Sequence, residues 1–576
     1  MTCLSGFRNR LSFILVATTS ALSLTSAAQA ATLTGNAFFV ENNGGGDLLN
    51  VGRVDDADAS GTATLDTSRV FESGTDPEEL TARPKIDVGE GQTGLVTIEG
   101  EGTVIELTGT GTGSKLEIGD DPGGDGTVVI QDGATVILTG DEGGAADGNN
   151  VFVQFGEDGG TGEVTVDDAT LLLEGFDTVA ILASSNTLAT GTFNVINGAE
   201  VQVLQRGDPG DDPGQIGFIR VGNGGFGGAT GPSDGAMLVD SSTILISSEL
   251  AEAGLFVGTN GGTGEVAMTN GSVVTIEGPI GSYATIGGDD DSSGRLTLSN
   301  TSELNLNGPN ASLNIGGTPN TNETAPGFGE VSILSGSSID ITARNDAGVA
   351  VQVGEVLPED GTSSVASLTV SGDGSRLTTA DSVQIGQTGG DGTTTAILTV
   401  ENGGRIEAAD ITIAEGGTLT GSDGSLSGNT IIEAGGVLAV GSSPGEMIFE
   451  DDLIVSGGIL ELEVGADAFD IITVLGDFII EEPVDIFIEF LDDAFPEVGE
   501  TYQFFNIEGE IVSDEETLAL SMLSLPDGIE GQFFFDEGLS FEVTEAVNPI
   551  PLPAAGWLLL ASLGGMSLLR RRTGNT

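Results

Sequence analysis

The chain has 576 residues, with 88 acidic against 16 basic side chains, a formal net charge of −72, one cysteine and no histidine. The lack of histidine excludes a Ser-His-Asp triad, a histidine general base and histidine-ligated zinc. The negative charge repels nucleic acid and anionic lipid, so we expect neither as a partner of the body of the protein.

The first 30 residues have the pattern of a secretory signal peptide. Two arginines precede an apolar stretch over residues 11–24, and Ala28 and Ala30 form an A-x-A cleavage site before Ala31. We therefore expect export through the Sec machinery. The only cysteine, Cys3, lies inside this segment, so the mature chain would carry no disulfide.

The region after the signal peptide is rich in glycine, yet 38% of the whole chain is hydrophobic, which argues against disorder. Its apolar residues are mostly Val, Ile and Leu in alternation, separated by Gly, Asn and Asp, as in short strands joined by turns. A four-residue pattern ending in glycine recurs at intervals of 29 to 38 residues, with one interval of 66 that spans about two units. Its copies are residues 86–89, 116–119, 153–156, 219–222, 255–258, 284–287, 313–316, 351–354 and 383–386.

This repeat predicts an all-β fold, a parallel β-helix (solenoid) of about ten coils with about three strands each. One coil cannot bury its own apolar face, so the coils would share one long core. The alternative is a string of small β-sandwiches, but no unit is long enough to close a sandwich alone. The turns also resemble those of autotransporter-like and adhesin-like passenger proteins.

Composition divides the exported body into three parts. We expect an N-terminal β cap over residues 31–85, a β-helical repeat domain over 86–445 and a C-terminal β domain over 446–547. Glycine becomes less frequent and phenylalanine more frequent after about residue 446. Caps at both ends would protect the open edges of a solenoid.

Two kinds of chemistry remain for the body. Paired carboxylates serve glycosidases, but with 88 acidic residues their chance proximity carries little information. Arg206, Arg220 and Arg405 are candidates for the arginine that some β-helical polysaccharide lyases use as a base. We expect no enzyme activity, and we keep a polysaccharide-acting β-helix enzyme, either a lyase or a glycoside hydrolase, as the alternative.

Calcium is the one candidate cofactor. Clustered aspartates on glycine-rich loops offer the oxygen ligands that a hard cation prefers. The alternative is solvated turns without an ion. Residues 159–164 and 261–266 match the glycines of the G-G-x-G-x-D calcium repeat but place valine where aspartate is required. The candidate ligands are Asp120, Asp121, Asp125, Asp289, Asp290 and Asp291.

The last 29 residues combine a proline motif, an apolar span and a basic end. Residues 550–569 carry no charge and are about long enough for a helix that crosses the roughly 30 Å hydrocarbon core of a membrane. A tryptophan lies near the start of this span and three arginines follow it, as the positive-inside rule requires. The residues that define the pattern are Pro549, Pro551, Leu552, Pro553, Ala554, Trp557, Arg570, Arg571 and Arg572.

This tail resembles the VPLPA variant of the PEP-CTERM sorting domains of Gram-negative bacteria, with Ile550 in place of the usual valine. The resemblance implies that an exosortase-type membrane protease recognises the proline motif and cleaves near it. Residues 548–576 would then be the sorting signal, made of the proline motif, a transmembrane helix and the arginine stop. Its helix would anchor the chain in the inner membrane transiently, before delivery to the cell surface or the extracellular matrix.

Taken together, these features predict an exported solenoid with a structural or adhesive role in a biofilm or the extracellular matrix. Its expected partners are the Sec machinery, the exosortase-type protease, and extracellular polysaccharide or cell surfaces.

Overall fold

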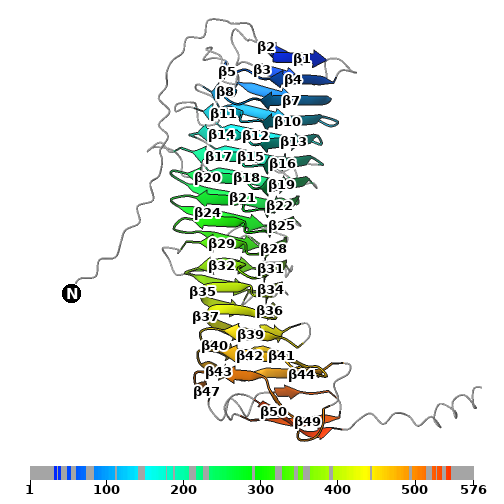
Figure 1. Cartoon of the computed structure of the whole chain (residues 1–576), viewed down its shortest axis with the longest axis vertical. Coiled ribbons are helices and arrows are strands. Elements are labelled where there is room, and N and C mark those ends of the chain that lie inside the picture. Colours follow the sequence, from blue (N-terminus) through cyan, green and yellow to red (C-terminus); the bar gives the residue numbers. More distant parts are fainter. Residues whose placement is uncertain are drawn as a thin grey trace, which may run out of the picture.

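The computed structural model describes residues 31–35, 37–40, 48–52, 60–72, 84–109, 113–140, 150–176, 178–185, 188–206, 216–224, 233–288, 292–317, 327–342, 348–354, 364–387, 394–441, 444–491, 496–513, 522–526, 528–534 and 540–546. Within these residues every regular element is a β-strand (Figure 1). No helix of the described part is long and apolar enough to cross a membrane. The signal segment, the sorting tail and Asp289–Asp291 lie outside the described residues.

The strands form three parallel stacks that run along the long axis of the molecule, from the blue end of Figure 1 to the red end. The first stack contains β4 (Gly61–Leu65), β7 (Thr93–Glu99), β10 (Asp125–Gln131), β13 (Thr161–Asp167), β16 (Thr190–Ile196), β19 (Asp234–Asp240), β22 (Thr263–Thr269), β25 (Ser293–Leu298), β28 (Phe328–Leu334), β31 (Val365–Ser371), β34 (Thr395–Glu401), β36 (Gly417–Gly421), β38 (Val437–Val440), β41 (Ile459–Val464), β44 (Asp485–Phe490) and β48 (Met522–Ser524).

The second stack contains β5 (Arg69–Glu72), β8 (Val104–Gly109), β11 (Thr135–Gly140), β14 (Thr170–Gly175), β17 (Glu200–Gln205), β20 (Thr243–Ser248), β23 (Val273–Glu277), β26 (Glu303–Asn307), β29 (Ser338–Ile341), β32 (Arg376–Thr379), the first part of β35 (Arg405–Ile413) and of β37 (Gly424–Glu433), β39 (Glu446–Phe449), β42 (Ile471–Val474) and β46 (Phe505–Ile507).

The third stack contains β3 (Leu48–Val51), β6 (Lys85–Val88), β9 (Lys115–Ile118), β12 (Val151–Glu157), β15 (Val179–Ser185), β18 (Gly217–Asn223), β21 (Glu252–Thr259), β24 (Gly281–Ile286), β27 (Ser312–Ile315), β30 (Val349–Val353), β33 (Ser382–Ile385), the second part of β35 and β37, β40 (Leu453–Ser456), β43 (Phe478–Glu482) and β47 (Ile511–Val512). The all-β parallel solenoid expected from the repeat is confirmed in this coarse form.

Antiparallel strands lie at both ends of the stacks. β1 (Ala31–Gly35) pairs with β4 and β2 (Ala37–Val40) pairs with β3. At the other end, β45 (Thr501–Gln503), β49 (Ile529–Phe534) and β50 (Ser540–Ala546) form a separate antiparallel sheet. These strands cover edges that would otherwise offer unpaired backbone groups.

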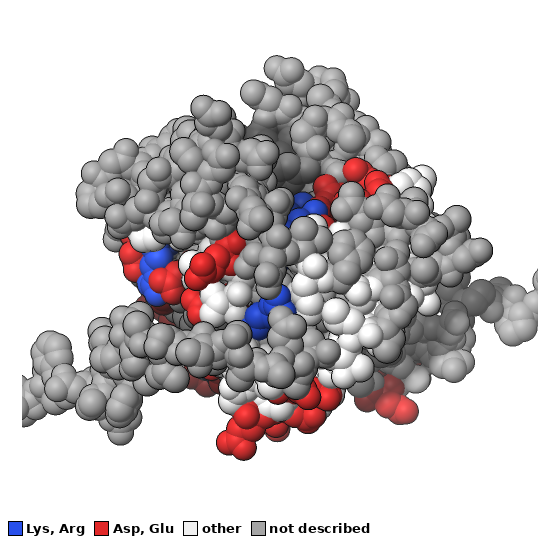
Figure 2. All heavy atoms as spheres, turned by 90° about the horizontal axis from the view of Figure 1, so that it is seen from above, with Lys and Arg blue, Asp and Glu red and all other residues white. Residues whose placement is uncertain are grey.

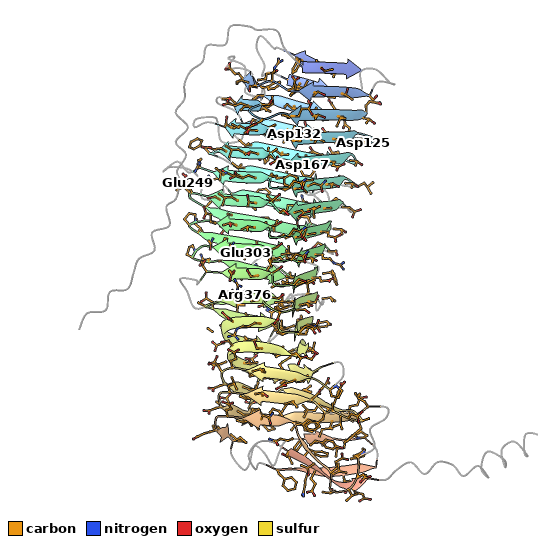
Figure 3. The ribbon with its side chains drawn as sticks, in the orientation of Figure 1. Asp125, Asp132, Asp167, Glu249, Glu303 and Arg376 are labelled. Carbon is orange, nitrogen blue, oxygen red and sulfur yellow. The ribbon has the colours of Figure 1, made fainter. Side chains whose placement is uncertain are left out.

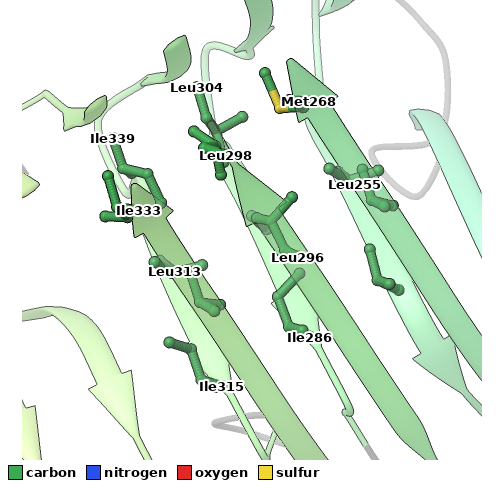
Figure 4. Close-up of a cluster of buried hydrophobic side chains, with 14 of the residues drawn as sticks. Leu255, Met268, Ile286, Leu296, Leu298, Leu304, Leu313, Ile315, Ile333 and Ile339 are labelled. Atoms are coloured by element: carbon green, nitrogen blue, oxygen red, sulfur yellow. The ribbon is translucent and has the colours of Figure 1, made fainter. Parts of the chain in front are cut away.

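Alternate residues of every stack point into one continuous hydrophobic core. Equivalent positions in successive coils carry similar side chains, because the parallel register places them directly above one another. Met268, Leu298 and Ile333 form one such column in the first stack, and Leu304 and Ile339 form another in the second (Figure 4). Each fully buried aliphatic side chain contributes about 1.5–3 kcal/mol to folding.

The repeated glycine after each third-stack strand has a structural cause. Gly119 adopts a left-handed φ of 64°, and a Cβ there would lie 1.8 Å from the carbonyl oxygen of Thr161 in the next coil. A Cβ added at Gly162 would lie 2.5 Å from the backbone nitrogen of Gly156. The Gly-rich and Thr-Gly turns therefore let the backbones of successive coils approach each other.

A second turn, between the first and second stacks, has its own repeated position. The residue before β11, β14 and β17 is a buried alanine, and the residue before the next five second-stack strands is a buried serine: Ala134, Ala169 and Ala199, then Ser242, Ser272, Ser302, Ser337 and Ser375. Ser272 donates its hydroxyl to the carbonyl of Val239 in the preceding coil at 2.8 Å. This hydroxyl adds a tie between coils that the alanines lack.

The parallel stacking extends beyond the boundaries that composition suggested. It begins before residue 86, with β3 paired to β6, and residues 49–52 match the repeated pattern with Gly52 at a φ of 79°. It also continues past residue 446, because β39 to β44 pair in parallel with the preceding and following coils. Within the 66-residue interval, β15 supplies the missing third-stack strand.

Candidate functional site

The outer face of the third stack differs from that of the other two at β6, β9 and β12, because outward-pointing side chains there are buried. Asp87 lies between the core residues Ile86 and Val88 and points away from the core, yet it is only 5% exposed. Glu117 is 6% exposed and Gln154 is 8% exposed. The outward positions of the first stack are, by contrast, mostly exposed or half-buried, as Asp125 in Figure 3 illustrates. Polar chemistry on the third stack is therefore held away from water.

Three successive strands of this face, β6, β9 and β12, carry a cluster of opposite charges. Lys85 stands in register with Lys115, and Asp87 stands in register with Glu117. These are the only two lysines of the chain. With Glu157 at the end of β12 they form what we term the lysine–acid cluster: Lys85, Asp87, Lys115, Glu117 and Glu157.

Ion pairs join the members of the lysine–acid cluster across coils. The Nζ of Lys85 lies 2.7 Å from Oδ1 of Asp87 and also contacts Glu117. The Nζ of Lys115 contacts Glu117 and lies 3.8 Å from Oε2 of Glu157. Glu117 is therefore shared by two ammonium groups, which compensates its burial.

Burial shifts the protonation equilibria in this cluster towards the neutral forms. It raises the pKa of Asp87 and the pKa of Glu157, although nearby lysines act in the opposite direction. Burial also lowers the pKa of Lys115, and the positive charge of Lys85 adds to this effect. Burial raises the pKa of an acid and lowers the pKa of an amine because it removes the water that stabilises the charged form. The ion pairs of the cluster offset only part of this loss.

Of the expected calcium ligands, the described part of the structure places only Asp120 in a group that could hold a cation, and its two partners there were not expected ligands. Carboxylate oxygens of Glu117, Asp120 and Glu157 lie within 4.8 Å of one another, which is close enough to hold a cation. This group does not include Asp121 or Asp125, which are both exposed. Because Lys115 already contacts Glu117 and faces Glu157, a calcium ion would have to compete with its ammonium group.

The three arginines that sequence analysis singled out make separate structural contacts. Arg206 pairs with Glu174 at 3.1 Å and with Glu249 at 2.8 Å (Glu249 is labelled in Figure 3), which ties three coils of the second stack together. Arg405 binds Glu450 through two guanidinium nitrogens. The guanidinium carbon of Arg220 lies 5.0 Å from the ring centroid of Phe218 on the third stack. The three arginines therefore do not share a site.

A cavity of about 450 Å³ lies beside the first stack near its C-terminal end. Strands β38, β41 and β44 line it together with Leu525 and Pro526, and it contains Glu461, Glu463 and Glu489. Burial, followed by the charges of Glu489 and Glu461, raises the pKa of Glu463. No lysine or arginine lines this cavity.

The end-on view in Figure 2 shows the charge at one end of the molecule. Among the coloured side chains in view, acidic ones are the more numerous, and the basic ones are scattered. This agrees with the excess of acidic residues in the sequence.

Comparison with known proteins found no matching family model and no significantly similar curated protein. The fold itself defines the class: an all-β protein of parallel strands that coil around one shared core.

The lysine–acid cluster was not predicted from the sequence. Its signal is nonetheless present, because Lys85 and Lys115 stand 30 residues apart at the same position of the repeat, one residue before its four-residue pattern. Placing the two lysines side by side required the register of the strands, which the repeat length alone does not give.

Proposed function

We propose that this protein is an exported surface or matrix solenoid with a structural or adhesive role. The observation that carries the proposal is the single core shared by three parallel stacks, which makes the described body one elongated unit. Backbone ladders join each coil to the next, so the unit resists bending without any bound ligand. Repeated surface turns then present similar chemistry at regular intervals.

The two ends of the sequence support delivery to the outside. Residues 1–30 have the pattern of a Sec signal peptide, and residues 548–576 resemble an exosortase sorting domain. In this proposal the apolar span holds the chain in the inner membrane until an exosortase-type protease cleaves near Pro551 and Pro553. The body is then released to contact extracellular polysaccharide or neighbouring cells.

Mass spectrometry of the extracellular protein tests the sorting step. We expect a mature N-terminus at Ala31 and a C-terminus near the proline motif. Extracellular protein that still ends at Thr576 would contradict cleavage. Replacement of Pro551 and Pro553 by alanine should retain the full-length chain in the membrane fraction, while replacement of the exposed residue Asp132 by asparagine should leave export unchanged.

Calcium binding belongs to the same proposal as a property of the acidic turns. Thermal unfolding before and after dialysis against a chelator measures it. If calcium is structural, its removal should lower the melting temperature, and re-addition of calcium alone should restore it. An unchanged melting temperature would show that the acidic turns are solvated and hold no structural calcium.

The cavity at the C-terminal end gives one observation in favour of the rival function, a polysaccharide-acting enzyme. Glu463, with its raised pKa, and Glu489, its register neighbour on the adjacent parallel strand β44, resemble the acid pair of a glycosidase. Release of reducing ends from neutral polysaccharides, lost in Glu463→Gln, would support this function. No release from any polysaccharide tested would leave the structural role.

A further inference from the structure

The lysine–acid cluster contains the parts needed for an internal amide bond between two coils. Lys115 on β9 offers a primary amine, and Glu157 at the end of β12 offers a carboxyl group, with Nζ 3.8 Å from Oε2. The backbone N–H of Glu157 donates to the carbonyl of Gly119 at 3.2 Å, which ties the end of β12 to the coil of Lys115. The two reacting groups are therefore held together by the fold, which replaces a bimolecular encounter.

We propose that Lys115 and Glu157 condense to a side-chain amide that covalently joins successive coils. This modification is independent of the surface role proposed above. It requires no cofactor, oxidant or second protein, because the four side chains that it uses all lie on β9 and β12: Lys115, Glu117, Gln154 and Glu157.

Each neighbouring side chain has a defined part in the condensation. Glu117 contacts the Lys115 amine and can accept its proton. Gln154 stands in register with Glu117 and hydrogen bonds to the Glu157 carboxyl group, so its amide N–H can stabilise the oxygen that becomes negative during attack. The two reacting side chains are only 19% and 20% exposed, so they are largely shielded from water.

The bond changes balance without an external reagent. A proton passes from the Lys115 ammonium group to the Glu157 carboxylate, which gives an amine and a carboxylic acid. The Lys115 nitrogen then attacks Cδ of Glu157. Glu117 takes a proton from this nitrogen and returns it to the departing hydroxyl, so that one C–N bond forms, one C–O bond breaks and one water molecule leaves.

Tryptic peptide mass spectrometry of the purified, folded full chain tests the proposal directly. Trypsin cleaves after an unmodified Lys115 and next after Arg206, which yields peptides 86–115 and 116–206. An acylated Lys115 resists trypsin, so the linked protein should yield one peptide spanning 86–206 that is lighter by one water molecule. Tandem fragmentation should place the link at Glu157.

Variants separate the bond from a structural role of the cluster. Lys115→Arg keeps the charge but should abolish the water loss, whereas the matched variant Lys85→Arg should keep the link between Lys115 and Glu157. Glu117→Gln should lower the linked fraction at a given time after synthesis. Separate peptides 86–115 and 116–206 from folded wild-type protein, or a link to another carboxyl group, would overturn the proposal.

Discussion

The backbone N–H of Glu463 donates to Oδ2 of Asp470 at 2.6 Å, while Oδ1 of the same carboxyl group accepts the N–H of Gly445 at 2.9 Å. Asp470 is fully buried, and it joins the loop after β41 to the chain that leads into β39 of the preceding coil. Burial raises its pKa to about 7, although both hydrogen bonds act in the opposite direction. The Asp470 carboxyl group thus ties two coils together, and its ionisation makes the stability of the fold depend on pH.

The first prediction concerns this pH dependence. Because the folded-state pKa of Asp470 is about 7 and the model-compound value is 3.8, the native state holds one more proton than the unfolded state between these values. The free energy of unfolding should therefore fall as pH rises from 4 to 7, by roughly 2–4 kcal/mol from this group. Urea unfolding at several pH values measures the slope.

Asp470→Asn should flatten that slope, since asparagine does not titrate. The exposed Asp132→Asn serves as the control for loss of one charge, because asparagine tolerates the left-handed φ of 57° at this position. An unchanged slope in Asp470→Asn would show that other groups cause the pH dependence.

The second prediction distinguishes two roles of glycine. Gly119 and Gly198 both have a left-handed φ, of 64° and 87°, but a Cβ at Gly198 would meet nothing within 4 Å. Gly198→Ala should cost about 1 kcal/mol for backbone strain alone. Gly119→Ala should cost at least about 3 kcal/mol, because its Cβ overlaps the Thr161 carbonyl of the next coil. Equal shifts of the denaturation midpoint would contradict the close approach of the coils.

The third prediction concerns the buried hydroxyls at the turn before the second stack. Ser272→Ala removes the hydrogen bond to Val239 but places an alanine where earlier coils already carry Ala134, Ala169 and Ala199. We expect a loss of about 1 kcal/mol without a change of fold. Ser272→Val adds volume at a position that is 0% exposed, and it should cost more. Chemical denaturation compares the two, and a valine variant as stable as the alanine variant would exclude tight packing there.

The fourth prediction concerns the lysine–acid cluster. Lys85→Met leaves Asp87 and Glu117 with less compensation in a buried site, so the loss at pH 7 should be about 2–4 kcal/mol. The loss should shrink as pH falls, because burial raises the pKa of Asp87 and its neutral form needs no compensating charge. The surface pair of Arg295 with Glu330, at 2.8 Å with Arg295 51% exposed, is the control. Arg295→Met should cost less than about 1 kcal/mol, and an equal loss in both variants would argue against burial as the cause.

The parallel solenoid could be predicted because its sequence signal is local and repeated. Inward positions alternate at period two, and a glycine follows the third-stack strand in most coils. The pattern failed where a coil keeps the strand but changes the glycine. In register, Ala183 matches Phe155 and Ser185 matches Glu157, so Ser184 takes the place of Gly156 in the 66-residue interval.

The site was harder to predict than the fold because its chemistry depends on register between coils. Asp120 was chosen as a calcium ligand from the aspartates adjacent to it in sequence. The structure instead brings it to Glu117 and to Glu157 of the next coil. After residue 446 the higher phenylalanine content alters what fills the core, as with Phe449 and Phe478, while the parallel pairing of the strands continues.

The strict register between coils makes the length of this protein adjustable. Thr263 at the start of β22 pairs with Ser293 at the start of β25, so each coil presents its successor with an equivalent of itself. Duplication or loss of one whole coil would change the end-to-end distance by about 4.8 Å, the spacing of neighbouring strands. Each new contact between coils would resemble the contacts that the protein already has. Recombination within the gene can therefore change the length of the protein in equal steps, without a change in the sequence of any coil.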